Sequence, residues 1–153
     1  MLYHHSYEYL EPGDVVRAGN WGRIVQGYGG QHPIFFREAL WELVRKREYP
    51  TVPSRLTAAY YYDDEQVARN GMREGDQGRA PNLYEVELVT PMAATHRADL
   101  HLWERAWWDA HQPTEAESIA RAYWAGHTPT GRTECLTNSD LRILKVIERS
   151  RPR

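Results

Sequence analysis

A strict alternation of apolar and polar residues over 84–89 is the feature that most constrains the fold. Tyr84, Val86 and Leu88 fall on one face of an extended chain, and two glutamates fall between them. Because successive side chains of a strand point to opposite faces, this pattern predicts a half-buried strand with one face against a core. Two carboxylates at this spacing could act as an acid–base pair, but the wet face of such a strand usually carries charges, so we assign them to solvent.

Helical periodicity predicts a long helix that begins at Pro33 and ends before Pro50, with basic residues in its last turn. Its apolar side chains recur at the 3.6-residue period, at Phe36, Leu40, Leu43 and Val44. We expect this set of side chains to form the face that packs on the core, with Trp41 also engaged in packing.

Two further helices and two further β segments are expected. One helix opens at Asp63, which would be its N-cap, and another runs from a capping box at Thr114 to about Gly126. Composition predicts strands over 56–62 and 141–147, and a polar, turn-rich loop over 71–81.

The stretch 17–32 contains five glycines without periodicity, and we expect a mobile loop there that covers a bound ligand or lies on the surface. It has no Gly-Lys-Ser/Thr sequence and no Gly-x-Gly-x-x-Gly between a strand and a helix. The phosphate-binding loops that those motifs build are therefore not expected.

Length and composition favour a single small domain. The 153 residues predict one domain over 1–148 followed by a frayed tail over 149–153. A formal net charge of -2 gives no global basic field for nucleic acid. One cysteine, no basic-then-apolar leader and no apolar run near the roughly 20 residues of a membrane span favour a cytoplasmic protein.

The first candidate ligand contacts lie at the N-terminus. Leu2 and Tyr3 favour a short strand, and the Pro12-Gly13 turn follows, so His4, His5 and Ser6 stand at the end of that strand. From spacing alone, ligand contacts and the alternative, a surface pair or the remnant of a tag, are about equally favoured.

A histidine-rich segment later in the chain raises the question of a metal site. His96, Asp99 and His101 carry side chains that bind metals, but their spacing is not a recurrent metal motif and the cysteine is distant. We therefore expect no metal.

The run Tyr3-His4-His5-Ser6, followed by Leu10-Glu11-Pro12-Gly13-Asp14, resembles the opening of the compact bacterial ADP-ribosyltransferases. These include the rifampicin-modifying enzymes and, more widely, toxins that modify DNA bases. His5 stands where that family usually has glycine. The resemblance implies an α+β fold in which two small, bent antiparallel sheets form an NAD cleft with flanking helices, and it implies NAD as the substrate.

The same resemblance assigns roles to individual residues. The family carries a His-Tyr-acid signature on three strands, which His4, Tyr60 and Glu134 would supply here. Glu134 lies in an Arg-x-Glu-apolar-Leu setting like that of the family acid, and Asp99 is a second candidate for that acid. The common Gln or Glu two positions before the acid is replaced by Arg132, which argues against an arginine-modifying enzyme.

The remaining implied contacts surround the cofactor-like substrate. His5 and Ser6 would offer main-chain groups to the nicotinamide carboxamide, and Arg55 would hold pyrophosphate or cover the sheet. Tyr60 and Tyr61 are both candidates for the aromatic wall, but neighbours in a strand face opposite ways, so only one can contact the ligand. Tyr60 is the first choice, and three ordinary sheet tyrosines are the alternative.

The expected function is mono-ADP-ribosylation of an acceptor that is a nucleic acid, a protein or a small molecule, by a bacterial or phage enzyme. Two alternatives share the pocket: an NAD hydrolase and a catalytically inactive nucleotide-binding module. The family contains toxins and resistance factors, and for a toxin the resemblance implies a neutralising partner protein.

Overall fold

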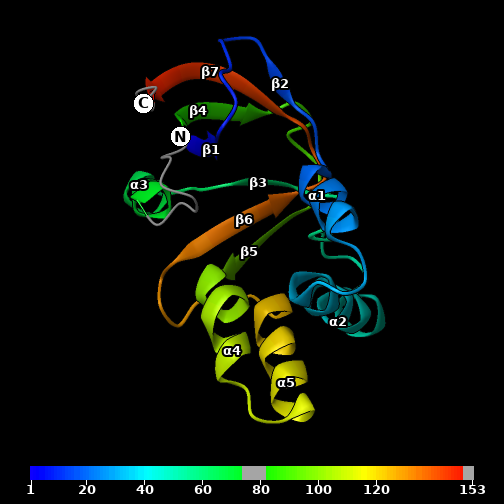
Figure 1. The fold of residues 1–153 in the computed structure, drawn as a ribbon. Helices are drawn as coiled ribbons and strands as arrows, with labels where there is room; N and C mark the ends of the chain where they lie inside the picture. Colours follow the sequence, from blue (N-terminus) through cyan, green and yellow to red (C-terminus); the bar gives the residue numbers. More distant parts are fainter. Residues whose placement is uncertain (74–81, 150–153) are drawn as a thin grey trace.

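Two antiparallel sheets with helices around them make up the fold, so the expected α+β class is confirmed (Figure 1). The computed structural model describes residues 1–73 and 82–149. Of the predicted loop over 71–81, only the first three residues are described, and these are helical. The rest of that loop and residues 150–153 of the predicted tail lie outside the described residues.

The first sheet has the strand order β1-β4-β7-β2. Its strands are β1 (Leu2–Ser6), β2 (Val15–Val16), β4 (Asn82–Leu88) and β7 (Leu141–Glu148). The alternation over 84–89 is confirmed, because Tyr84 and Val86 are buried and the intervening glutamates are partly exposed. The β4–β7 register shifts twice, and such bulges bend and twist a sheet, in keeping with its curled shape in Figure 1.

The second sheet has the order β3-β6-β5. Its strands are β3 (Ala59–Tyr61), β5 (Thr95–Asp99) and β6 (Thr133–Thr137). The strand predicted over 56–62 is thus shorter than expected. It is preceded by a turn in which Ala58 N–H donates to the Ser54 carbonyl at 2.9 Å.

One pair of backbone hydrogen bonds joins the two sheets, in the part of the chain that the structure describes. Tyr3 N–H donates to the Tyr62 carbonyl at 2.8 Å, and Tyr62 N–H donates to the Tyr3 carbonyl at 2.7 Å. The strands β1 and β3 therefore meet at this point. In Figure 1 the β1-β4-β7-β2 sheet lies above the β3-β6-β5 sheet.

The helices lie around this split pair of sheets (Figure 1). They are α1 (Asn20–Tyr28), α2 (Pro33–Glu48), α3 (Glu65–Arg73), a π-helix η2 (Leu102–Ala106), α4 (Trp107–Asp109) and α5 (Pro113–Trp124). Helix α3 packs on β1, and α2 packs on α1 and α5. Among the described residues, no helix has both the length and the apolar character needed to span a bilayer.

The mobile loop expected over 17–32 is wrong, because most of this stretch is helix α1. The glycines mark its ends and its packing face. Gly19 before the helix and Gly29 after it adopt positive φ angles of 85° and 72°, which favour glycine. A Cβ at Gly22 would lie 2.1 Å from the carbonyl oxygen of Leu56, so this glycine lets α1 pack directly on the turn before β3.

The predicted core face of α2 is wrong in part. Phe36 and Leu43 are 59% and 67% exposed, whereas the charged residues Arg37 and Glu38 are buried. The helix is rotated from the expected orientation because those two charges have buried partners elsewhere in the fold. The predicted packing role of Trp41 is confirmed, since its side chain is fully buried.

Two other predicted helix starts are displaced by a residue or two. Asp64 caps α3, its carboxylate accepting from Val67 N–H at 2.9 Å, in place of the expected Asp63. Helix α5 starts at Pro113, and the Glu115 carboxylate accepts from the N–H of Gln112 at 3.2 Å, so the expected capping box at Thr114 is shifted.

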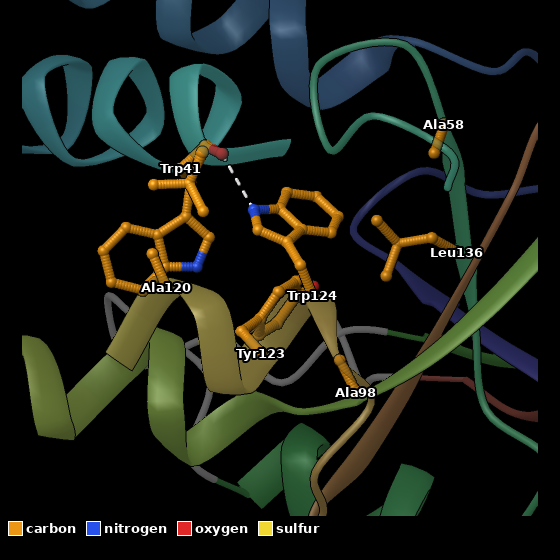
Figure 2. Packing of buried hydrophobic residues seen from close by; sticks show 8 residues of the cluster. Trp41, Ala58, Ala98, Ala120, Tyr123, Trp124 and Leu136 are labelled. Carbon is orange, nitrogen blue, oxygen red and sulfur yellow. Dashed lines mark hydrogen bonds between the residues drawn. The ribbon is translucent and has the colours of Figure 1, made fainter. Parts of the chain in front are cut away.

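The main core lies between α2, α5 and the β3-β6-β5 sheet (Figure 2). Trp124 and Trp41 dominate it, and the Trp124 indole N–H donates to the Trp41 carbonyl at 2.8 Å. Truncating a buried tryptophan of this kind costs about 3–5 kcal/mol. Glu134 lies two residues from the core residue Leu136 in β6 and so shares its face, which places this core directly beside the site described next.

Arg149, the first residue of the predicted tail, contacts the segment that follows β1. Arg149 Nη2 donates to the Leu10 carbonyl at 3.3 Å, and its guanidinium pairs with Glu11. The first residue of the predicted tail is therefore anchored to the segment that follows β1.

Candidate functional site

A cavity of about 540 Å³ lies between the two sheets. Its walls come from β1, the β2–α1 segment, the turn before β3, β3 itself, η2 and β6. It brings together six of the residues proposed from the sequence: His4, His5, Ser6, Arg55, Tyr60 and Glu134. Cavities that bind small molecules have volumes of about 300–1,000 Å³, so this one has room for a sizeable ligand.

His4 is held by the strand on the other side of the split. Its Nδ1 lies 2.8 Å from the carbonyl oxygen of Tyr60. Burial lowers the pKa of His4, which favours the neutral ring. Since a carbonyl only accepts, Nδ1 carries the proton and Nε2 is left as an acceptor. No described residue bonds to Nε2.

His5 is engaged on the side of helix α3. Its Nε2 lies 2.9 Å from the Tyr62 hydroxyl, and the two rings stack with centroids 5.1 Å apart. Burial, followed by the neighbouring His4, lowers the pKa of His5 to about 4. A Cβ at Gly71 would lie 3.3 Å from His5 Nε2, so a glycine in α3 makes room for the imidazole of His5.

Glu134 is buried and held in place through one oxygen. Its Oε1 accepts from the Tyr123 hydroxyl at 2.6 Å and from the guanidinium of Arg55. Its Oε2 has no hydrogen bond to any described residue, and the side chain lines the cavity. The carboxylate is therefore oriented by the protein and retains one acceptor atom for a ligand.

Arg55 is the charged centre of the site. Besides Glu134, it donates from Nε to Glu38 at 3.0 Å and from Nη1 to the Tyr123 hydroxyl at 2.5 Å. Its guanidinium carbon lies 4.3 Å from the centre of the Trp103 ring. With its donors shared between two carboxylates and a tyrosine, Arg55 positions Glu134, and the predicted pyrophosphate contact would have to compete with these partners.

Tyr60 and Tyr61 diverge as strand geometry requires. The Tyr60 ring lines the cavity, and its hydroxyl donates to the Arg55 carbonyl at 2.7 Å. Burial holds the pKa of this phenol well above its usual value near 10. Tyr61 packs instead in the second core cluster with Tyr84 and Cys135, and it does not line the cavity.

Asp99 lies apart from the cavity. Its side chain is fully buried and accepts from Thr130 N–H at 2.7 Å, from the Thr130 hydroxyl and from His101 N–H at 2.9 Å. These bonds close the loop before β6. Of the two acids considered from the sequence, only Glu134 lines the cavity.

The residues considered for a metal site are likewise engaged in structural contacts. His96 Nε2 lies 3.0 Å from the Tyr123 carbonyl. Within residues 1–73 and 82–149, no three His, Cys, Asp or Glu side chains are grouped to hold a metal ion.

Comparison with known protein families shows to which family the chain belongs. Residues 6–149 match the family described as Protein of unknown function (DUF2441). The chain belongs to the DUF2441 family. No curated protein matches it.

Sequence reasoning missed several residues of the site in this DUF2441 protein. Trp103 and Glu104, from the π-helix η2, both line the cavity. The guanidinium of Arg37 lies 3.5 Å from the Trp103 ring centre and donates to the Trp103 carbonyl at 3.0 Å. Burial, followed by the charge of Arg55, lowers the pKa of Arg37 to about 10. A π-helix has no common sequence signature, and only the tryptophan itself hinted at a ligand wall.

Glu38 was also missed, although it completes the charge arrangement of the DUF2441 site. Its Oε1 accepts from the Trp21 indole N–H at 2.7 Å as well as from Arg55. Helices α1 and α2 therefore meet the turn before β3 at a single carboxylate. The sequence does not identify Glu38 as buried, because the apolar periodicity of its helix predicts that charged residues face solvent.

Proposed function

We propose that this DUF2441 protein is a mono-ADP-ribosyltransferase that cleaves NAD and transfers ADP-ribose to an acceptor. The observation that carries the proposal is that His4, Tyr60 and Glu134, from three strands far apart in the sequence, line one cavity. This is the His-Tyr-acid set that the resemblance implies, in the order and on the strands expected for it.

Glu134 would assist cleavage of the bond between nicotinamide and ribose. As that bond breaks, positive charge develops on the ribose, and a carboxylate fixed beforehand stabilises it without reorganisation. The support for this role is that Oε1 is held by Arg55 and Tyr123 while Oε2 remains an acceptor towards the cavity. Oε2 would accept a hydrogen bond from a ribose hydroxyl.

Tyr60 and His4 would hold the two ends of the substrate. The Tyr60 ring, fixed through its hydroxyl, offers a surface for the nicotinamide ring. His4 Nε2 offers an acceptor to a hydroxyl of the adenosine-side ribose. The cavity also has Arg17 and Arg23 on its β2–α1 wall, and two cations suit the diphosphate.

The split between the two sheets would be the NAD cleft. Strands β1 and β3 meet at Tyr3 and Tyr62, and His4 and Tyr60 lie close to that junction on its two sides. A flat dinucleotide would lie along the split with its reactive bond near Glu134. Helices α1 and α3 would flank it.

The inactive nucleotide-binding module keeps one observation in its favour, the imidazole of His5 at the family's glycine position. The His5 ring is hydrogen-bonded to Tyr62 and lies against Gly71, so it is directed towards helix α3. An NAD hydrolase would use the same residues with water as the acceptor.

Nicotinamide release from NAD by the purified protein tests the proposal. We expect release by the parent protein and a decrease of at least about 100-fold in Glu134→Gln, because the fixed negative charge is removed. Glu87→Gln is the matched control, since Glu87 pairs with Arg142 on the surface. Calorimetry with NAD and ADP-ribose adds the second readout. Tight binding without turnover would support the module, and a fully active Glu134→Gln would remove the assigned role.

A further inference from the structure

A second, smaller cavity of about 160 Å³ adjoins the first. Tyr62 and Leu100 line both cavities. Arg132 lines the smaller one, and Glu104 lines the larger one. Arg132 Nη2 lies 3.3 Å from Glu104 Oε2, so this ion pair stands where the two cavities meet.

Glu104 reaches this junction through a distortion of the helix. It belongs to η2, in which the backbone follows π-helical hydrogen bonding, and it directly follows Trp103 of the cavity wall. Short π-helical segments are rare and are frequent at functional sites because they redirect side chains. The Glu104 side chain is 35% exposed, so an incoming molecule can reach it.

The junction lies beside Glu134. Leu100 N–H donates to the Arg132 carbonyl at 2.8 Å, which extends the pairing of β5 with β6 by one residue. Residues two apart in an extended chain point to the same face about 7 Å apart, so Arg132 and Glu134 share a face. The carboxylate that pairs with Arg132 therefore lies on the same side of the sheet as Glu134.

We propose that Glu104 is the general base that receives the proton of the acceptor, and that the acceptor enters through the smaller cavity. This inference rests on the proposed function. Arg132 orients the carboxylate towards the junction. Glu134 and Glu104 then have separate tasks: the first stabilises charge on the ribose, and the second activates the attacking group.

The proposed step balances without any further reagent. The bond between the ribose C1′ and the nicotinamide nitrogen breaks, and its electron pair neutralises the pyridinium. A lone pair of the acceptor forms the new bond to C1′. The proton of the acceptor passes to Glu104 and then to solvent.

This chemistry defines the class of acceptor. The attacking atom carries a proton that must leave, as in a hydroxyl or an amide-like N–H. The acceptor presents that group through a space of about 160 Å³ lined by Asn70, Val67 and Tyr62. A bulky folded partner would have to insert a single side chain or base.

Azide provides the test, because this anion attacks C1′ without a proton to lose. The parent protein, Glu104→Gln, Glu104→Ala and Glu134→Gln are each incubated with NAD in buffer, so that water is the acceptor. Both nicotinamide and ADP-ribosyl products are quantified. We expect the two Glu104 variants to release nicotinamide at least about 100-fold more slowly than the parent. Added azide is expected to restore release and to yield ADP-ribosyl azide in these two variants, but not in Glu134→Gln.

The outcomes separate the two proposals. A parent protein that releases no nicotinamide removes the proposed function, and the role of Glu104 with it. An active parent with equally active Glu104 variants overturns only the base. Slow Glu104 variants that keep the parent's urea midpoint but do not respond to azide also overturn the base, because they show a structural role.

Discussion

The guanidinium of Arg55 donates to the carboxylate of Glu134, 79 residues away in the chain, and the two side chains are only 4% and 6% exposed. The same guanidinium also pairs with the buried Glu38. One guanidinium therefore pairs with two buried carboxylates. The position of Glu134 is set by the protein before any ligand arrives, which is what electrostatic stabilisation of a developing charge requires.

Removal of Glu38 should destabilise the fold strongly. Glu38→Ala deletes the acceptor of both Arg55 and Trp21 and leaves a buried cation with one carboxylate fewer. Breaking a buried ion pair in this way costs about 3–5 kcal/mol. Urea unfolding at pH 7 measures the free energy of unfolding. Glu48→Ala, which removes an exposed partner of Arg47 and Arg121 from the same helix, is the control and should change it far less. A loss below about 1 kcal/mol in Glu38→Ala would contradict the central role of this pair.

Two glycines of α1 should respond in opposite directions to the same substitution. Gly22→Ala places a methyl group 2.1 Å from the Leu56 carbonyl oxygen, so α1 must move away from the turn that carries Arg55. Overpacking of this kind costs about 1–3 kcal/mol. Gly27→Ala meets no atom within 4 Å and should stabilise the helix by up to about 1 kcal/mol.

Thermal unfolding of the two glycine variants provides the measurement, together with NAD binding by calorimetry. Weaker NAD binding is expected in Gly22→Ala alone, because Arg17 and Arg23 on the cavity wall flank this contact. Equal melting temperatures for the two variants would show that α1 does not pack as described.

Stability should decrease as the pH falls from about 6.5 to about 4. In the unfolded chain His5 takes up a proton near pH 6.5. In the folded protein burial and His4 lower its pKa to about 4. Between these values the unfolded state binds more protons, so the free energy of unfolding decreases, and the loss ends once folded His5 also titrates. A difference of this size corresponds to at most about 3 kcal/mol, and His4 contributes in the same direction.

Urea unfolding at several pH values compares the parent protein with His5→Gln. The variant should lose less stability over this interval than the parent. His127→Gln, which alters an exposed histidine, should behave like the parent. Parallel pH curves for parent and His5→Gln would show that His5 is not buried as a neutral ring.

Patterns that depend on local chemistry were predictable from the sequence. The alternation around Tyr84 identified β4, and Pro33 marked the start of α2. The resemblance supplied His4, Tyr60 and Glu134, which no periodicity could have brought together. Their convergence depends on strand order, and that order follows from long-range pairing.

The errors arose where tertiary partners override local patterns. On α2, the apolar Phe36 and Leu43 are exposed because Arg37 and Glu38 turn inward to Trp103 and Arg55. The glycines before α2 suggested a loop, but Gly22 is there because a backbone carbonyl lies against the helix. Neither Leu56 nor Arg55 can be recognised as a partner from the residues near these positions.

Among the described residues, one pair of backbone hydrogen bonds, between Tyr3 and Tyr62, joins the two sheets. A small rotation about it would change the width of the far rim much more than distances near the pivot. His4 is adjacent to Tyr3, and Tyr60 is two residues from Tyr62. Their separation would therefore change little in such a rotation.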